Sequence, residues 1–167
     1  MSLGKTFLAE VLHEATSTRK LLAVIPFEQA DFKPHEKSMS LKQLATHVTE
    51  ITGWWKECLI QDELDFSVGD FKPKEINSTE DLLAMHDDLV TKATKILSEV
   101  ADEEFNKPWT MRNGEQIYFT MPKVVVVRTW CLNHLFHHRG QLTVYLRLLN
   151  VKLPSTYGPT ADDTMGM

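Results

Sequence analysis

The chain has 167 residues, of which 43% are hydrophobic and 25% charged, a size and composition typical of one globular domain with its own core. The net charge of −5 includes no cluster of lysine and arginine, so we expect no nucleic-acid surface. No apolar run approaches the roughly 20 residues that span a bilayer, no signal peptide is visible, and two cysteines are too few for a disulfide framework, which together favour a reduced, cytoplasmic protein.

The first predicted helix covers residues 3–25. Its apolar residues, which include Phe7, Val11 and Leu22, recur at helical spacing, and Pro26 ends the pattern. Residues 26–39 are polar and predict a connection.

A second helix is predicted from Ser40 to about Leu59. Ser40 and Gln43 have the spacing of a capping box, in which each side chain binds the backbone of the other residue. His47 falls in the middle of the apolar face of this helix. A buried imidazole must be hydrogen-bonded or coordinated, because an unpaired polar group in a core costs about 1–3 kcal/mol.

Residues 60–77 contain Gly69, Pro73 and several acids, and predict a loop. Ser78 then has the properties of an N-terminal cap, with acidic residues in the first turn that follows. The third helix is predicted to reach about Val100, and His86 borders its apolar face. We expect a histidine satisfied at the edge of the core there, with a ligand role as the alternative.

Two alternating segments, residues 109–111 and 116–119, flank Asn113 and Gly114, a pattern that predicts a β-hairpin. Residues 120–122 suit the start of a fourth helix, with proline in its first turn, that runs to about Leu149. Residues 154–167 predict an irregular tail. The chain is therefore expected to be a single all-α domain over residues 1–167, a four-helix bundle with long crossover connections and a small hairpin before the last helix.

His134 and His138 are four residues apart, so they lie on one face of the fourth helix. With His47 they supply three imidazoles that face the interior, which leaves a fourth position on a metal ion for water, as in catalytic zinc sites. Nitrogen ligands suit zinc, nickel, iron or copper. The alternative is three core histidines that are each hydrogen-bonded separately.

Other residues near this site are weaker candidates. Glu50 and Gln141 each lie three residues after a candidate ligand, where they could orient an imidazole or assist proton transfer. Cys131 and His137 are predicted to be a small core residue and a flanking residue. Three aromatic residues are candidates for a pocket rim, namely Trp54, Trp109 and Tyr118. Three others could pack against a second subunit, namely Leu132, Phe136 and Leu146.

Two motifs carry a resemblance to a known family. They are Ser40-Leu41-x-x-Leu44-x-x-His47 and Asn133-His134-x-x-x-His138-Arg139-Gly140-Gln141. Together with the hairpin and the tail motif Pro154-x-x-Tyr157-Gly158-Pro159-x-Ala161-Asp162, they resemble the DinB/YfiT family over almost the whole chain. The resemblance implies a four-helix bundle, often a homodimer, that holds a divalent metal, commonly nickel or zinc, on three histidines. By position these match His47, His134 and His138.

Three hypotheses for the function follow. The first is a metal-dependent enzyme that activates water, or a low-molecular-weight thiol such as relatives use, for attack on a small-molecule substrate, in transferase- or hydrolase-type chemistry. The second is a metal-binding stress-response protein without catalysis. The third is a helical dimerisation module whose histidines are structural.

Overall fold

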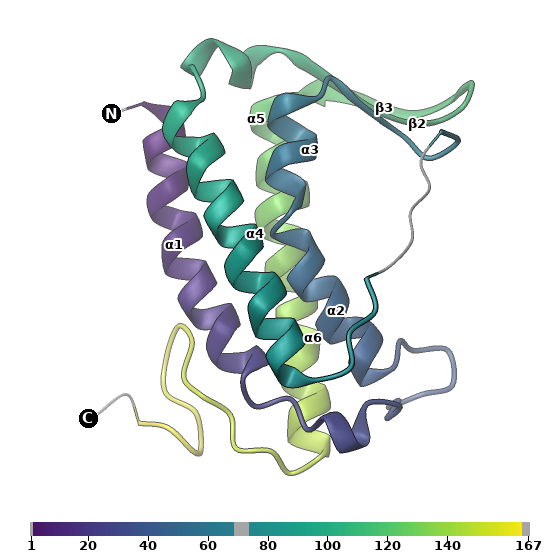
Figure 1. Cartoon of the computed structure of the whole chain (residues 1–167), viewed down its shortest axis with the longest axis vertical. Helices are drawn as coiled ribbons and strands as arrows, with labels where there is room; N and C mark the ends of the chain where they lie inside the picture. The colour runs from purple at the N-terminus through teal and green to yellow at the C-terminus, as the bar shows by residue number, and fades with distance from the viewer. Residues whose placement is uncertain (1, 69–73, 165–167) are drawn as a thin grey trace.

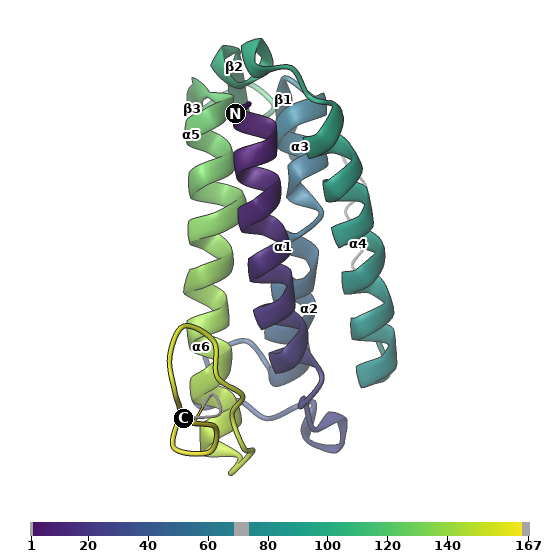
Figure 2. The same ribbon diagram turned by 90° about the vertical axis from the view of Figure 1, so that its left-hand side faces the viewer.

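The computed structural model describes residues 2–68 and 74–164, which are mostly helical and include one three-stranded sheet. The helices run side by side along the long axis, and the strands lie at the same end as the N-terminus (Figure 1, Figure 2). Gly69 and Pro73 of the predicted loop, and the last three residues of the predicted tail, lie outside the described residues. Within the described ranges, no helix is long and apolar enough to cross a membrane.

The first helix, α1 (Leu3–Leu22), confirms the helix predicted before Pro26 and ends three residues earlier than expected. It packs against α4 (Thr79–Glu99). Gly4 permits a close approach of the two helices, because a Cβ atom at this position would lie 2.5 Å from the carbonyl oxygen of Leu97 on α4. The connection that follows α1 contains one short 3₁₀ helix, η1 (Phe27–Gln29).

The predicted capping box is confirmed at the start of α2 (Leu41–Ile51). The Ser40 hydroxyl accepts from the backbone N–H of Gln43, and the backbone N–H of Ser40 donates to the Gln43 side chain, at 3.2 Å and 2.8 Å. The single helix expected over residues 40–59 is wrong, however, because the helix is interrupted after Ile51 and resumes as α3 (Trp54–Ile60).

The interruption has a local cause. The backbone N–H groups of Thr52 and Gly53 donate to carbonyl oxygens three residues earlier, at 3.2 Å and 2.8 Å, instead of continuing the α-helical pattern. A Cβ atom on Gly53 would lie 3.1 Å from Cδ2 of Leu89 on α4, so glycine lets α4 lie close to this point. The second helix therefore consists of two parts, both of which contact α4.

The loop predicted over residues 60–77 contains a short strand, β1 (Glu63–Asp65), which is a correction. The strand pairs in parallel with β2 (Pro108–Asn113), a partner more than 40 residues away that no local pattern indicates. Ser78 caps α4 as predicted, and its hydroxyl accepts from the backbone N–H of Asp81 at 3.0 Å. A 3₁₀ helix, η2 (Asp102–Asn106), leads from α4 to the sheet.

The hairpin prediction is confirmed by β2 and β3 (Gln116–Pro122), which pair in antiparallel orientation. Gly114 takes the first position between the paired residues Asn113 and Gln116 with φ = 59°, a left-handed conformation that glycine adopts without strain. The expected helix start at residues 120–122 is wrong, because these residues pair with residues 108–110 and extend β3.

The last helix therefore begins at Lys123. It consists of α5 (Lys123–Val126), a π-helical segment η3 (Val127–Asn133) and α6 (His134–Leu148). Lys123 is fully buried, and its Nζ donates to the carbonyl oxygen of Leu59 at 3.2 Å and pairs with Glu104 and Asp62. The π-helical turns end where His134 begins α6, and such turns are frequent next to functional sites.

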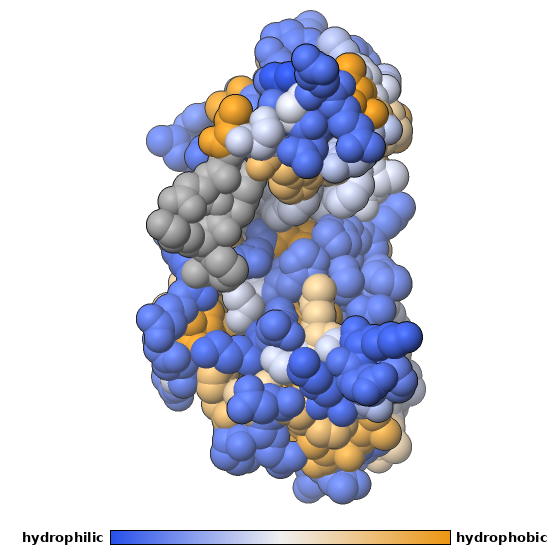
Figure 3. All heavy atoms as spheres, turned by 90° about the vertical axis from the view of Figure 1, so that its right-hand side faces the viewer, coloured by the Kyte–Doolittle hydropathy of each residue, from blue (hydrophilic) through white to orange (hydrophobic). Residues whose placement is uncertain are grey.

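The buried apolar residues form two clusters. One is nearer the sheet and includes Trp55, Trp109 and Leu132, and the other includes Leu135 and Leu146. Burial of Leu132 and Leu146, at 1% and 0% exposure, corrects the expectation that they face a second subunit. On the face shown in Figure 3 most of the surface is hydrophilic, and hydrophobic groups gather in separate patches. His134 lies in the chain between Leu132 and Leu135, where one cluster gives way to the other.

Candidate metal centre

The structure brings His47, His134 and His138 together. Each offers one ring nitrogen, and these three atoms lie within 4.8 Å of one another. The Nε2 atoms of His47 and His134 are 3.2 Å apart, and the His138 ring centroid lies 4.6 Å from that of His47. The cluster forms because α2 packs against α6 and because the four-residue spacing places His134 and His138 on the same face of α6.

The donor set fits a divalent metal ion. Imidazole nitrogens at about 2.0–2.1 Å from a tetrahedral ion lie about 3.4 Å apart, close to the measured separation of the two Nε2 atoms. Burial, followed by the nearby His47 and His138 rings, lowers the pKa of His134 to about 4. Burial and His138 likewise lower the pKa of His47. These two rings are therefore neutral at pH 7, the form that coordinates a metal.

Gln141 contacts the cluster. Its Oε1 lies 2.8 Å from Nδ1 of His138, and its amide nitrogen lies 3.1 Å from Nε2 of His137. An amide oxygen only accepts, so Nδ1 of His138 carries the proton and Nε2 is left with a free lone pair for a metal. His137 itself is exposed and lies outside the three-histidine group.

The Glu50 carboxyl group has no hydrogen bond or ion pair with residues that the structure describes, so the expected contact with an imidazole is not seen. Its carboxyl group is half-buried, and burial raises its pKa. Glu50 instead lines a pocket between α3 and α4.

Two further candidates lie outside the three-histidine group. His86 is 1% exposed on α4, its Nδ1 lies 3.4 Å from a carboxylate oxygen of Asp87, and burial lowers its pKa. Cys131 is buried with its Sγ atom 3.8 Å from that of Cys58, and burial raises its pKa. Cys131 is the small core residue that the sequence predicted. His86 differs from the satisfied histidine expected at the edge of the core, because it is fully buried and its Nε2 has no hydrogen-bond partner among the described residues.

Stacked aromatic rings lie beside His134. The rings of Trp54 and Trp130 are stacked with centroids 5.7 Å apart, and their centroids lie 5.9 Å and 5.5 Å from the His134 ring. Phe119 also stacks on Trp130, with ring centroids 5.8 Å apart. Of the three rim candidates only Trp54 is next to the cluster. Trp109 is a core residue at 0% exposure, and Tyr118 is half-exposed on the hairpin.

A buried polar cluster next to His138 was missed in the sequence. The Arg139 guanidinium is 3% exposed and donates to the Glu14 carboxylate, to the Glu14 carbonyl oxygen at 3.1 Å and to the Thr18 hydroxyl at 3.0 Å. Tyr157 of the tail contacts Arg139 and donates to the Glu14 carboxylate at 2.7 Å. Burial, followed by the hydrogen bond to Glu14, raises the pKa of Tyr157 to about 12.

A signal for this cluster was present in the sequence. Glu14 and Thr18 continue the buried spacing of Phe7 and Val11 along α1, and a charged residue at such a position predicts a buried partner of opposite charge. Arg139, the residue after His138, thus links α6 to α1, and Tyr157 links the tail to α1.

Comparison with known proteins gives a consistent result. The sequence model of the DinB family matches residues 1–165. A DinB-like protein from Bacillus cereus is 22% identical, with 92% of this chain and 97% of that chain covered and a TM-score of 0.69. A DinB-like protein from Bacillus subtilis is 18% identical, with 95% and 98% covered and a TM-score of 0.68. A DinB family protein from Exiguobacterium sibiricum is 23% identical, with 90% and 94% covered and a TM-score of 0.64. At these identities the structures establish the fold alone. No curated protein is a significant match.

Proposed function

Because the chain belongs to the DinB family, we propose that it is a metal-dependent enzyme that activates water or a small thiol for attack on a small-molecule substrate. The observation that carries the proposal is the convergence of His47, His134 and His138. Three imidazoles hold zinc or nickel, the two ions we favour, and leave coordination positions open. An ion bound in this way supplies Lewis acidity, which lowers the pKa of a bound water or thiol toward neutrality.

The chain's own residues have separate tasks in this proposal. His47, His134 and His138 bind the ion, and Gln141 holds the His138 ring with its Nε2 free. Trp54 and Trp130 cover one side of His134 and exclude water from it. Glu50 is the candidate for proton transfer, because burial raises the pKa of its carboxyl group in the direction of pH 7.

The arrangement of the helices supports the family fold. We propose a four-helix bundle with crossover connections, in which α2 with α3, and α5 with η3 and α6, each form one interrupted member. The side-by-side course of the helices and the packing of α1 on α4 and of α2 on α6 support this arrangement (Figure 1). The single domain, the homodimer and the cytoplasmic location stay predictions.

The test begins with elemental analysis of freshly purified protein, followed by reloading with zinc or nickel and a screen of small thiols and electrophiles. Substitution of His47, His134 or His138 by alanine is expected to remove the metal and the activity. His137→Ala is the matched control, because His137 is adjacent in the chain and lies outside the group.

Two results would contradict the proposal. Stoichiometric metal without turnover, and without exchange of a water or thiol ligand, would favour a non-catalytic metal-binding protein. Protein that contains no metal and takes up neither zinc nor nickel would favour a helical module with structural histidines.

A further inference from the structure

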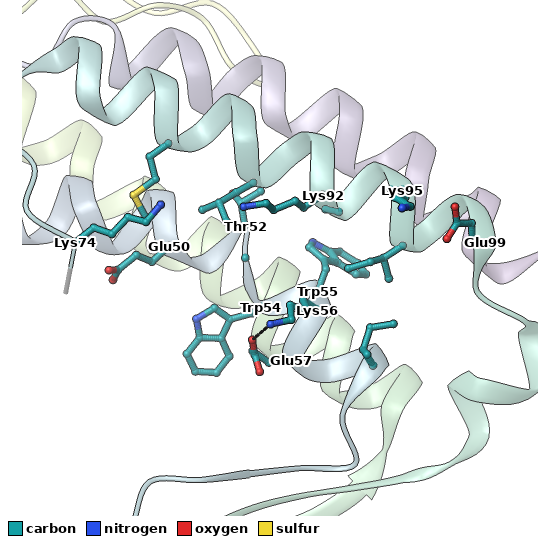
Figure 4. A pocket seen from close by; sticks show the side chains of 16 residues that line it. Glu50, Thr52, Trp54, Trp55, Lys56, Glu57, Lys74, Lys92, Lys95 and Glu99 are labelled. Carbon is teal, nitrogen blue, oxygen red and sulfur yellow. Dashed lines mark ion pairs between the residues drawn. The ribbon is translucent and has the colours of Figure 1, made fainter. Parts of the chain in front are cut away.

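A large pocket lies between α3 and α4, and its volume of about 670 Å³ falls in the range of small-molecule sites. Most of its lining surface is apolar. The large apolar residues of the lining come from both helices. They are Trp54, Trp55 and Ile60 on α3, and Met85, Leu89 and Ile96 on α4. Figure 4 shows the ring of Trp55 between α3 and α4, and the ring of Trp54 farther from α4. An organic molecule with an apolar body would fit this space.

The pocket is connected to the three-histidine group through two residues. Trp54 lines the pocket and also lies against the His134 ring, with a centroid separation of 5.9 Å. Glu50 lines the pocket from α2, one helical turn after His47, and its carboxyl group has no partner among the described residues. A ligand in the pocket would therefore have one end close to the helix that carries His47.

The rim of the pocket carries charges of both signs. Lys56 pairs with Glu57 at 3.7 Å, and Lys92 pairs with Asp88 at 2.6 Å. Lys74 and Lys95 are exposed, and their ammonium groups have no ion pair or hydrogen bond with residues that the structure describes.

Lys74 and Lys95 lie at different ends of the pocket. Figure 4 shows Lys74 beside Glu50 at the end near α2, and Lys95 with Glu99 at the far end. Lys95 and Glu99 lie one turn apart on α4 and form no ion pair, so the ammonium group of Lys95 remains available to an anion. An anionic group of a ligand would be stabilised at this far end.

We propose that the pocket between α3 and α4 binds an organic acid whose apolar body lies along Trp54, Leu89 and Ile96 and whose anionic group binds Lys95. The opposite, reactive end of the molecule then lies beside Glu50. This assignment names the substrate class of the enzyme proposed above and rests on that function, whereas the binding itself can be measured without it.

Two fluorescent probes test the proposal on the full chain loaded with zinc. They are 8-anilinonaphthalene-1-sulfonate and N-phenyl-1-naphthylamine, which share an apolar ring system and differ in the sulfonate. We expect saturable binding of both. Lys95→Glu should weaken binding of the sulfonate at least fivefold and change binding of the neutral probe less than twofold. Leu89→Trp should weaken both probes at least fivefold, because the larger side chain fills the pocket.

The matched control for charge is Lys20→Glu, an exposed position at the end of α1, and it should leave both affinities unchanged. Thermal melting checks that each variant is folded. If Leu89→Trp does not fold, Lys95→Glu still decides, because it changes only an exposed side chain. Equal binding of the sulfonate by the wild type and Lys95→Glu, or the absence of saturable binding by the wild type, would overturn the proposal.

The His138→Ala variant separates the pocket from the metal function. It should lose zinc and keep the affinity for both probes. A wild type that binds zinc and neither probe contradicts the pocket assignment and leaves the metal enzyme standing. A wild type that binds both probes with the expected dependence on Lys95 and takes up no metal supports the pocket as a binding site and contradicts the proposed function.

Discussion

Gln141 accepts a hydrogen bond of 2.8 Å from Nδ1 of His138, one helical turn before it. Partners of this kind orient ligand imidazoles and typically change metal affinity about 10- to 100-fold. We expect Gln141→Ala to weaken zinc binding by about that factor, and Gln141→Glu to retain the affinity because a carboxylate also accepts. Competition with a chelating dye measures both. Unchanged affinity in Gln141→Ala would show that the contact does not position the ring.

Metal removal should lower stability. A ligand that binds only the folded state stabilises it by about 2.7 kcal/mol at a free concentration 100 times Kd. For a chain of this size that corresponds to an increase in Tm of about 5–10 °C. We expect zinc to produce this shift in the wild type and to have little effect on His47→Ala. Identical melting curves with zinc and with a chelator would contradict a site made by the folded protein.

The buried pair of Arg139 and Glu14 predicts a strong effect of truncation. Arg139→Met leaves a carboxylate buried without its cation, which costs about 3–5 kcal/mol. Glu14→Gln in the same chain should recover part of the loss. Arg147→Met is the control, because Arg147 pairs with Asp162 on the surface. This variant should lose much less free energy of unfolding than Arg139→Met. Urea denaturation provides the comparison, and equal losses in the two arginine variants would contradict this account.

Two glycines predict opposite results for the same substitution. Gly4→Ala places a methyl group against the backbone of α4 and should destabilise by about 1–3 kcal/mol. Gly140 lies inside α6 with no atom within 4 Å of an added Cβ atom, so Gly140→Ala should stabilise by about 0.5–1 kcal/mol. Denaturant midpoints distinguish the two. A stabilised Gly4→Ala variant would contradict the close contact of α1 and α4.

Asp65 predicts a pH dependence at the sheet. Its carboxylate accepts from the backbone N–H of Gly114 and from the backbone and hydroxyl of Ser67, which lower its pKa from 3.8 to about 2. Because the folded pKa is lowered, the stabilisation is present above about pH 4 and is lost as the pH falls through 2.

Asp65→Asn should therefore be less stable than the wild type at pH 5, and the difference should narrow toward pH 2. Melting temperatures across this range measure it. Asp31→Asn, at an exposed position in the first connection, is the control and should show no such dependence. A constant difference between pH 5 and pH 2 would contradict the assignment.

Features that depend on local spacing could be predicted from the sequence. The cap at Ser40, the cap at Ser78 and the turn at Gly114 each require only neighbouring residues, and all three are present. Strand β1 could not be predicted, because three residues become a strand only through pairing with β2. The burial of Lys123 likewise depends on Glu104, which lies on a separate element.

In the candidate metal site, too, some features follow from local spacing and others from packing between helices. The helical phase of His47, His134 and His138 is a local property, so the sequence could place all three on apolar faces. His86 has a similar phase, yet it lies on α4, which packs along α1, and it does not join the group. Which apolar faces meet is decided by packing between helices, so phase alone does not separate a candidate ligand from a core histidine.

The interruption at Thr52 and Gly53 divides one length of helix into two parts that share α4 as a neighbour and differ in their other contacts. α2 carries His47 and packs against α6 and α4, whereas α3 carries Trp54 and packs against α4 and η3. A tilt of α3 about this point changes the width of the pocket while the imidazole of His47 keeps its place. Related proteins can therefore diverge in the size of molecule that they accept through changes in α3, while the ion-binding residues remain the same.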